Sequence, residues 1–301
     1  MSDGRSGAGR GDAIQRTGPL PLSELRSRYL DPGIPVIVEG QVTQWSAYEK
    51  WTPDYLAREF GTTAVPVVKM RDGDYANANL IDIPLAEYLA YIGAIDTVTD
   101  DAENFDPNLT YYLAQVPLAS KLPKLMNDLE VPPFFPRERH TSAVIYVGAD
   151  QFSQLHYHPT GSATLSLLYG HKKVRLFAPD QTPYLYPYPA SSSKPNFSRT
   201  HQKHPNPRDF PDLAKASYLE GIVRAGEMLF IPIYWWHTID NEDVNIAVVF
   251  FWKRSWLSRF LPPRYMRAQF AFQVLNKPVN FSKRAARKLF RVSGLSRGAQ
   301  E

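Results

Sequence analysis

A succession of short hydrophobic segments fills the second half of the chain and limits the folds that it can adopt. The segments are rich in β-branched and aromatic residues and are separated by turn residues, as strands are. They cover residues 143–148, 152–158, 163–169, 173–179, 228–233 and 244–252. Because this pattern is typical of a barrel or of two packed sheets, we expect a mainly β fold with flanking helices.

Three histidines stand in or beside these segments at spacings that suggest a metal site. His156 and His158 are two residues apart, and His237 ends the sequence I-P-I-Y-W-W-H. Side chains at i and i+2 of a strand point to the same face, and a jelly roll would bring His237 beside them in the barrel mouth. Three imidazoles would hold a metal ion and leave coordination positions open. The alternative is that they are hydrogen-bonded core histidines, which fits the paired spacing less well.

The composition narrows the chemistry and the location. The chain has 301 residues, of which 44% are hydrophobic, enough for a sizeable core. It has no cysteine, which excludes disulfides, iron–sulfur clusters and thiol nucleophiles, so imidazoles and carboxylates must carry any metal chemistry. The amino terminus lacks the apolar segment of a secretory signal, and the longest apolar run, 246–252, is too short to span a bilayer. We therefore expect a cytoplasmic protein without membrane contact.

The charge is only mildly positive, at +4 with 34 basic and 30 acidic residues. Much of the excess lies near the carboxyl terminus, at Lys283, Arg284, Arg287, Lys288, Arg291 and Arg297. We interpret this cluster as a solvated helix face, which argues against nucleic acid as a partner.

The chain divides into three parts by composition. Residues 1–17 are rich in Gly, Ser, Arg and Asp, which predicts a disordered tail. Residues 18–256 hold the expected β domain, and residues 257–301 form a basic, helical extension. Two amphipathic segments of the extension, 265–275 and 282–292, would pack on a partner subunit in a homodimer.

Two signals outside the expected strands concern local structure. Thr52 precedes Pro53, and Gly61 follows eight residues later, which predicts a capped helix between them. Residues 184–218 form a long segment rich in Pro, Ser, Asn and Lys. Since a plain connection needs fewer residues, we expect this loop to shape the entrance of the site.

Lys172 is a candidate anion-binding residue. Lys172, Val174 and Leu176 would share one face of their strand, because side chains alternate. If that apolar face is the interior, Lys172 is a buried ammonium that requires an anion. The alternative is an outward lysine whose stem lies along the surface.

Several motifs occur together and in a characteristic order. They are Y-L-A-Q at 112–115, H-Y-H at 156–158, Y-G-H-K-K-V-R-L-F-A-P-D-Q at 169–181, L-Y-P-Y-P at 185–189 and I-P-I-Y-W-W-H at 231–237. In these motifs the chain resembles, from about Pro35 to Trp252, the JmjC-type, cupin-fold oxygenases that use Fe(II) and 2-oxoglutarate. Within that family its nearest likeness is to the asparaginyl hydroxylases. The resemblance implies a double-stranded β-helix, or jelly roll.

The resemblance also implies an activity and a division of roles. Such an enzyme uses Fe(II), 2-oxoglutarate and O2 to hydroxylate an unactivated C–H bond, here of a protein or peptide side chain or of a small biosynthetic intermediate. The metal ligands would be His156, His158 and His237.

The same resemblance implies a co-substrate pocket. Lys172 matches the basic residue that binds the far carboxylate of 2-oxoglutarate, and Tyr112 and Ser153 match hydroxyl-bearing residues that assist it. Trp252 matches an aromatic wall of the same pocket.

The chain departs from the family pattern at the metal site. His158 stands where the family has a carboxylate, so the expected site has three neutral imidazoles and is one unit more positive. Copper, nickel and zinc suit such ligands at least as well as iron does. The chain also has one extra residue between His156 and Gly170, and Ala163 and Phe250 stand where the family has asparagines.

These departures leave two other functions open. One is a three-histidine dioxygenase that binds its substrate directly to the metal and needs no 2-oxoglutarate, although Lys172 counts against it. The other is a catalytically silent cupin that serves as a binding module, with His158 marking lost chemistry. The retention of Lys172 and Tyr112 argues against such a loss.

Overall fold

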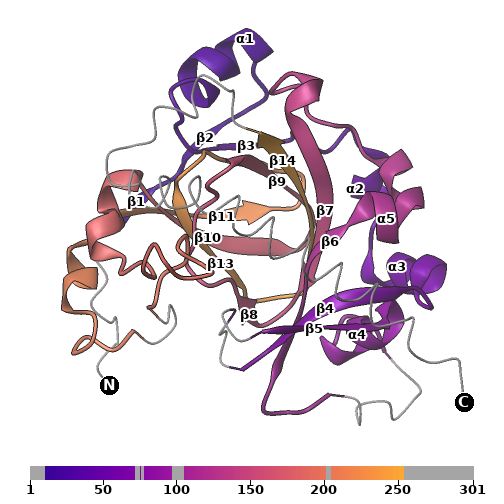
Figure 1. Ribbon diagram of the computed structural model, residues 1–301. Coiled ribbons are helices and arrows are strands. Elements are labelled where there is room, and N and C mark those ends of the chain that lie inside the picture. Colours follow the sequence, from indigo (N-terminus) through magenta and orange to yellow (C-terminus); the bar gives the residue numbers. More distant parts are fainter. Residues whose placement is uncertain (1–10, 72–74, 76–77, 97–104, 201–204, 254–301) are drawn as a thin grey trace, which may run out of the picture.

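The computed structural model describes residues 11–71, 75, 78–96, 105–200 and 205–253 (Figure 1). Its strands are β1 (Gly11–Ala13), β2 (Gln15–Thr17), β3 (Val36–Val38), β4 (Ala64–Met70), β5 (Asn79–Pro84), β6 (Thr110–Pro117), β7 (His140–Gly148), β8 (Gln151–Phe152), β9 (Gly161–Tyr169), β10 (His171–Phe177), β11 (Tyr218–Arg224), β12 (Met228–Ile231), β13 (Trp236–Asn241) and β14 (Asn245–Lys253).

The strands form two sheets that enclose a shared core. The smaller sheet has the order β1-β11-β10-β13-β8, and the larger has the order β2-β3-β12-β9-β14-β7-β6-β4-β5. Val174 and Val223 of the smaller sheet pack with Leu165, Leu229 and Val249 of the larger one. Because the inward side chains of both sheets meet in one cluster, the fold is a jelly roll, which confirms the expected mainly β class.

Short helices pack on the outer face of the larger sheet (Figure 1). They are α1 (Leu22–Leu25), α2 (Ser46–Lys50), α3 (Pro53–Phe60), α4 (Leu85–Tyr91) and α5 (Leu118–Lys121). The Thr52 hydroxyl accepts a hydrogen bond from the Tyr55 N–H at 3.1 Å, so α3 has the predicted cap. In α4 the Tyr88 hydroxyl donates to the Val147 carbonyl at 2.8 Å, which fastens the helix to the sheet.

Shorter helical turns complete the chain. They are a π-helical turn at Arg26–Leu30 and 3-10 turns at Pro123–Asp128, Arg137–Arg139, Pro179–Tyr184 and Pro211–Lys215. No helix in the described ranges is long and apolar enough to cross a membrane.

The turn at Gly170 passes the chain from β9 in the larger sheet to β10 in the smaller one. Gly170 has φ +71°, a conformation that side chains with a Cβ rarely adopt, and a Cβ there would lie 2.1 Å from the Val244 carbonyl oxygen. This tight turn fixes which side chains of β10 face the interior.

Residues 11–17 correct the prediction of a disordered tail. They form β1, which pairs parallel with β11, and β2, which pairs parallel with β3, so the segment joins the edges of the two sheets. Ile14, between the two strands, is 3% exposed and packs in the core. Composition predicted disorder wrongly here, because a strand at the edge of a sheet pairs through its backbone groups and needs only one apolar side chain to anchor it. Residues 1–10 and the expected extension at 257–301 lie outside the described residues.

We expect Ile14→Ala to destabilise the protein by about 2–5 kcal/mol, because it removes a buried side chain that links both sheets. Urea unfolding measures the change. Gln15→Ala is the matched control, because Gln15 is exposed and its loss should cost about 0.5 kcal/mol or less. Equal effects of the two substitutions would contradict the packing of residues 11–17 in the core.

Candidate metal centre and cavity

A pair of reciprocal backbone hydrogen bonds places His156, the first predicted ligand, beside His237. The His156 N–H donates to the His237 carbonyl at 3.1 Å, and the His237 N–H donates to the His156 carbonyl at 2.8 Å. His237 lies in β13, whereas His156 and His158 lie beyond the end of β8. The strand expected over 152–158 ends at Phe152, and beyond it His156 forms two isolated antiparallel bridges, to His237 and to Phe197.

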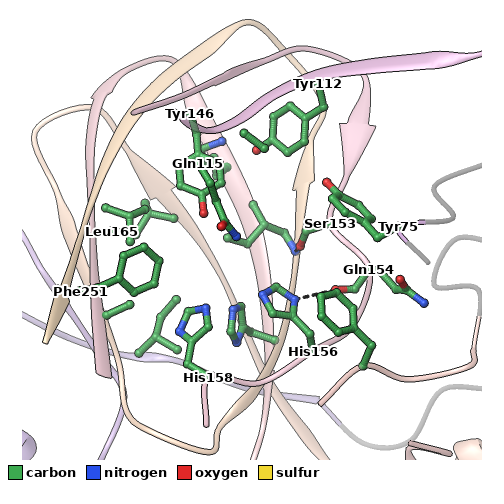
Figure 2. Close-up of a pocket in the computed structure, with 18 residues that line it drawn as sticks. Tyr75, Tyr112, Gln115, Tyr146, Ser153, Gln154, His156, His158, Leu165 and Phe251 are labelled. Carbon is green, nitrogen blue, oxygen red and sulfur yellow. Dashed lines mark hydrogen bonds between the residues drawn. The ribbon is translucent and has the colours of Figure 1, made fainter. Parts of the chain in front are cut away.

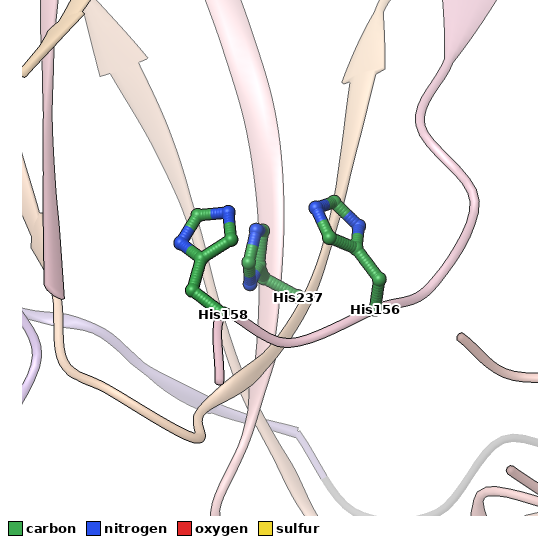
Figure 3. Close-up of side chains that lie close together, drawn as sticks. All are labelled: His156, His158 and His237. Carbon is green, nitrogen blue, oxygen red and sulfur yellow. The ribbon is translucent and has the colours of Figure 1, made fainter. Parts of the chain in front are cut away.

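The three histidine rings converge (Figure 3). One ligand nitrogen from each ring lies within 4.8 Å of the others. The ring centroids of His156 and His237 are 4.3 Å apart, and those of His158 and His237 are 4.6 Å apart. His237 is 2% exposed, and the other two are partly buried. The structure thus brings the three predicted residues together at one point.

Backbone carbonyls orient two of the rings. The His156 Nδ1 lies 2.7 Å from the Gln154 carbonyl oxygen, and the His237 Nδ1 lies 3.0 Å from the Trp235 carbonyl oxygen. A carbonyl can only accept, so each Nδ1 carries the proton and each Nε2 keeps a free electron pair. The His158 Nδ1 is buried and has no hydrogen-bond partner among the described residues.

Burial keeps the rings uncharged at neutral pH. It lowers the pKa of His156 to about 4 and that of His158 to about 3, and the neighbouring His156 ring lowers the latter further. The pKa of His237 is also well below its ordinary value, first because of burial and then because of the other two rings. Neutral imidazole is the form that binds metals, so the donor set fits a divalent transition metal.

A cavity of about 660 Å³, open to solvent at its mouth, extends from these rings. Tyr112 and Tyr146 lie toward the end opposite His156 and His158 (Figure 2). Its walls also include Tyr75, Ala114, Gln115, Ser153, Gln154, Ala163, Leu165, Lys172, Phe197, Ile231, His237, Ile239, Val249 and Phe251. The mostly apolar lining with a few polar groups suits a small ligand that makes a few fixed polar contacts.

Lys172 is in the cavity wall, on the inward face of β10 with Val174 and Leu176, and is 1% exposed. Its Nζ donates to the Asn241 Oδ1 at 2.5 Å. No carboxylate in the described part of the chain is within ion-pair distance of Nζ, and burial lowers the pKa of this lysine to about 7. The ammonium has three donors, so Nζ can also donate to an anion in the cavity.

Tyr112 and Ser153 also line the cavity. Burial raises the pKa of Tyr112 far above its usual range, so its hydroxyl stays protonated and can donate. The Ser153 Oγ accepts a hydrogen bond from the Ile239 N–H at 2.9 Å, which leaves its proton available to an acceptor. Two of the predicted helpers thus share one cavity with Lys172 and the histidines.

Trp252 corrects the prediction of an aromatic pocket wall. Side chains alternate along β14, so Val249 and Phe251 face the cavity, whereas Trp252 faces the helical layer. The Trp252 ring packs on Phe135, with centroids 5.5 Å apart. Its centroid also lies 5.3 Å from that of His140, which begins β7. Phe251 is the aromatic residue of β14 in the cavity.

Sequence reasoning missed several residues in the cavity wall or in contact with it. Asn241 lies four residues after His237 on β13, so strand alternation could have placed it on the same face. Gln115 had no such signal, because it lies at an irregularity in the pairing of β6 with β7 and has φ 58°. Phe197 stacks on His156 at a centroid distance of 5.0 Å and comes from the loop expected to shape the entrance.

The comparisons with known proteins agree with one another on the family of this chain. Residues 21–257 match the family described as a cupin-like domain. Lysine-specific demethylase 8 of Xenopus tropicalis is 29% identical over 238 residues, which cover 77% of this chain and 51% of that relative. Lysine-specific demethylase JMJ31 of Arabidopsis thaliana is 26% identical over 281 residues, 82% of this chain and 50% of that relative.

A further relative is not named as a demethylase. The tRNA wybutosine-synthesizing protein 5 of Gallus gallus is 25% identical over 230 residues, which cover 73% of this chain and 70% of that relative. The chain spans about half the length of the two demethylases.

Lys172→Met should change how stability depends on pH. The folded lysine has a pKa of about 7, whereas in the unfolded chain it titrates near its ordinary value of about 10.4. Between these values the unfolded state holds a proton that the folded state lacks, so the free energy of unfolding rises with pH, by at most about 1.4 kcal/mol per unit. The variant lacks this slope, so its stability relative to the wild type should fall from pH 7 to pH 9.

Urea unfolding at pH 7, 8 and 9 measures that difference. Lys173→Met is the control, since Lys173 is the next residue of β10 and faces the other way. A constant difference between Lys172→Met and the wild type would contradict a buried lysine without a counter-charge.

Proposed function

Because the chain belongs to the cupin-like, JmjC-type family of oxygenases that use Fe(II) and 2-oxoglutarate, we propose that it hydroxylates a C–H bond with these cofactors and O2. One observation carries the proposal. Three neutral imidazoles converge in a cavity whose wall also holds the buried Lys172. The three imidazoles would bind a metal ion, and the buried ammonium of Lys172 would bind a carboxylate.

In this proposal His156, His158 and His237 hold the metal. When bound, Fe(II) and 2-oxoglutarate supply the activation of O2, with oxidation of the co-substrate to succinate and carbon dioxide. The carbonyls of Gln154 and Trp235 keep two of the rings in the tautomer that presents Nε2 to the cavity.

The polar residues of the cavity orient the co-substrate. Lys172 Nζ binds its far carboxylate, and Tyr112 and Ser153 donate their hydroxyl protons to the same group. Asn241 holds the ammonium in position through its Oδ1, while its own Nδ2 donates to the Gln151 carbonyl at 3.0 Å. These contacts would fix the co-substrate so that its other end points toward the histidines.

Apolar side chains keep water from the centre. Leu165, Val249 and Phe251 line the cavity from the larger sheet, and Ile231 and Ile239 line it further. An apolar wall that excludes water strengthens the electrostatic interactions inside the cavity and limits side reactions.

The substrate that we propose is a protein or peptide side chain or a small biosynthetic intermediate. The names of the relatives include lysine and arginine demethylases and a tRNA wybutosine-synthesizing protein, so the named activities differ among related chains. We also propose a cytoplasmic location, and a homodimer through residues 257–301, which lie outside the described residues.

A second candidate is favoured by one residue. With His158 as third ligand, the site resembles that of a three-histidine dioxygenase, which binds its substrate to the metal and needs no co-substrate. In that function, or in a catalytically silent binding module, nothing would require the buried Lys172 in the cavity wall.

The decisive experiment measures bound metal and follows succinate formation from 2-oxoglutarate under O2 with Fe(II). We expect succinate from the wild type. Succinate only from His158→Asp would indicate a module silenced by the substitution. Bound iron with no turnover of 2-oxoglutarate by either protein would favour the second candidate.

Co-substrate affinity should depend on pH through Lys172. Its pKa is about 7, so below that pH the ammonium is already present, whereas above it binding of the dianion must first take up a proton. Affinity should therefore fall above about pH 7, by up to about tenfold per pH unit. Lys172→Met should bind weakly at every pH, and Lys173→Met should behave as the wild type.

Calorimetric titration of the Ni(II)-loaded protein with 2-oxoglutarate, in buffers of different ionisation enthalpy, measures both the affinity and the protons taken up. An affinity that is independent of pH between 6.5 and 8.5, or unaffected by Lys172→Met, would contradict the assigned role.

A further inference from the structure

The three histidine rings differ in the hydrogen bonds that their Nδ1 atoms make. The carbonyl oxygen two residues before His156 lies on its Nδ1, and the carbonyl oxygen two residues before His237 lies on its Nδ1. The His158 Nδ1 is equally buried but has no hydrogen-bond partner among the described residues. The centre therefore has two supported ligands and one unsupported ligand.

The cause is local. The carbonyl two residues before His158 belongs to His156, and that oxygen accepts the N–H of His237 at 2.8 Å in the bridge between the two segments. The rings that surround His158, those of His237, His156 and Phe251 at centroid distances of 4.6, 5.4 and 5.2 Å, offer no carbonyl either. The backbone itself is held, because the His158 carbonyl accepts from the Tyr234 N–H at 3.2 Å.

This difference affects how well each ring can bind a metal. A neutral imidazole carries one proton, and the ring ligates through the other nitrogen. At His156 and His237 the carbonyls place the proton on Nδ1, so Nε2 has a free electron pair with which to bind a metal. At His158 no acceptor favours that tautomer, and a ligand without such support typically loses about 10–100-fold in metal affinity.

We propose that His158 is the weak and exchangeable ligand of the centre, and that an external monocarboxylate can take its place. The proposal rests on the proposed function, because it takes the three histidines to be metal ligands. Exchange would bring a negative charge to a metal that otherwise has only neutral protein ligands, and it would restore the two-histidine, one-carboxylate set that suits non-haem iron.

The test compares Co(II) affinity in single variants of one background. We expect His156→Ala and His237→Ala to lose more than about 100-fold, and His158→Ala to lose about tenfold or less. Sodium formate should tighten Co(II) binding by His158→Ala and change its visible absorption, but should leave His156→Ala unrescued. His171→Ala is the matched control, because His171 lies at the β9–β10 turn, outside the cavity wall.

Similar losses in all three variants, or no effect of formate on His158→Ala, would overturn the proposal while the metal centre stands. Failure of the wild type to bind Co(II) would instead overturn the proposed function, and this inference with it. Imidazole 15N spectra of the metal-free wild type give a second measure that needs no substitution. They should show a single Nδ1–H tautomer for His156 and His237 but not for His158, and one common tautomer for all three would contradict the proposal.

Discussion

The reciprocal hydrogen bonds between the backbones of His156 and His237 are the constraint on which the site depends. They join the segment after β8 to β13 by one isolated bridge, so two ligands from distant parts of the sequence share a single register. The bridge also commits the His156 carbonyl to the neighbouring segment. One contact therefore aligns two rings and directs the carbonyl that lies two residues before the third ring toward β13.

The cavity combines uncharged metal ligands with a buried cation. Burial disfavours charge on the three imidazoles and on Lys172 alike, and no carboxylate of the described cavity wall offsets a metal ion or the ammonium. Anions from outside the chain would satisfy both positions at once. This makes a dianionic co-substrate a better occupant than a neutral one, since each of its carboxylates meets a site that lacks negative charge.

The sequence predicted the parts of the fold and site that follow from strand alternation. The alternation of Lys172, Val174 and Leu176 needed only the two-residue period of a strand. The three histidines also converge as predicted, although His156 and His158 lie outside any strand and the expected strand over 152–158 does not form. Trp252 was misplaced because adjacent residues of β14 face opposite layers, and a resemblance that is wrong by one position changes the face. Gln115 owes its place to a positive φ at an irregular pairing, which no local pattern signals.

His158 shows how one substitution can keep the shape of a site while changing its balance of charge. A carboxylate in this position would place a negative charge next to the metal and need no particular tautomer. The imidazole stays neutral because of burial, and its Nδ1 has no hydrogen-bond partner among the described residues. The proposed ligand at which the chain departs from the family pattern is thus also the one that the surrounding backbone supports least. In the proposed centre, His156 and His237 would therefore set the geometry, and bound anions would supply the negative charge.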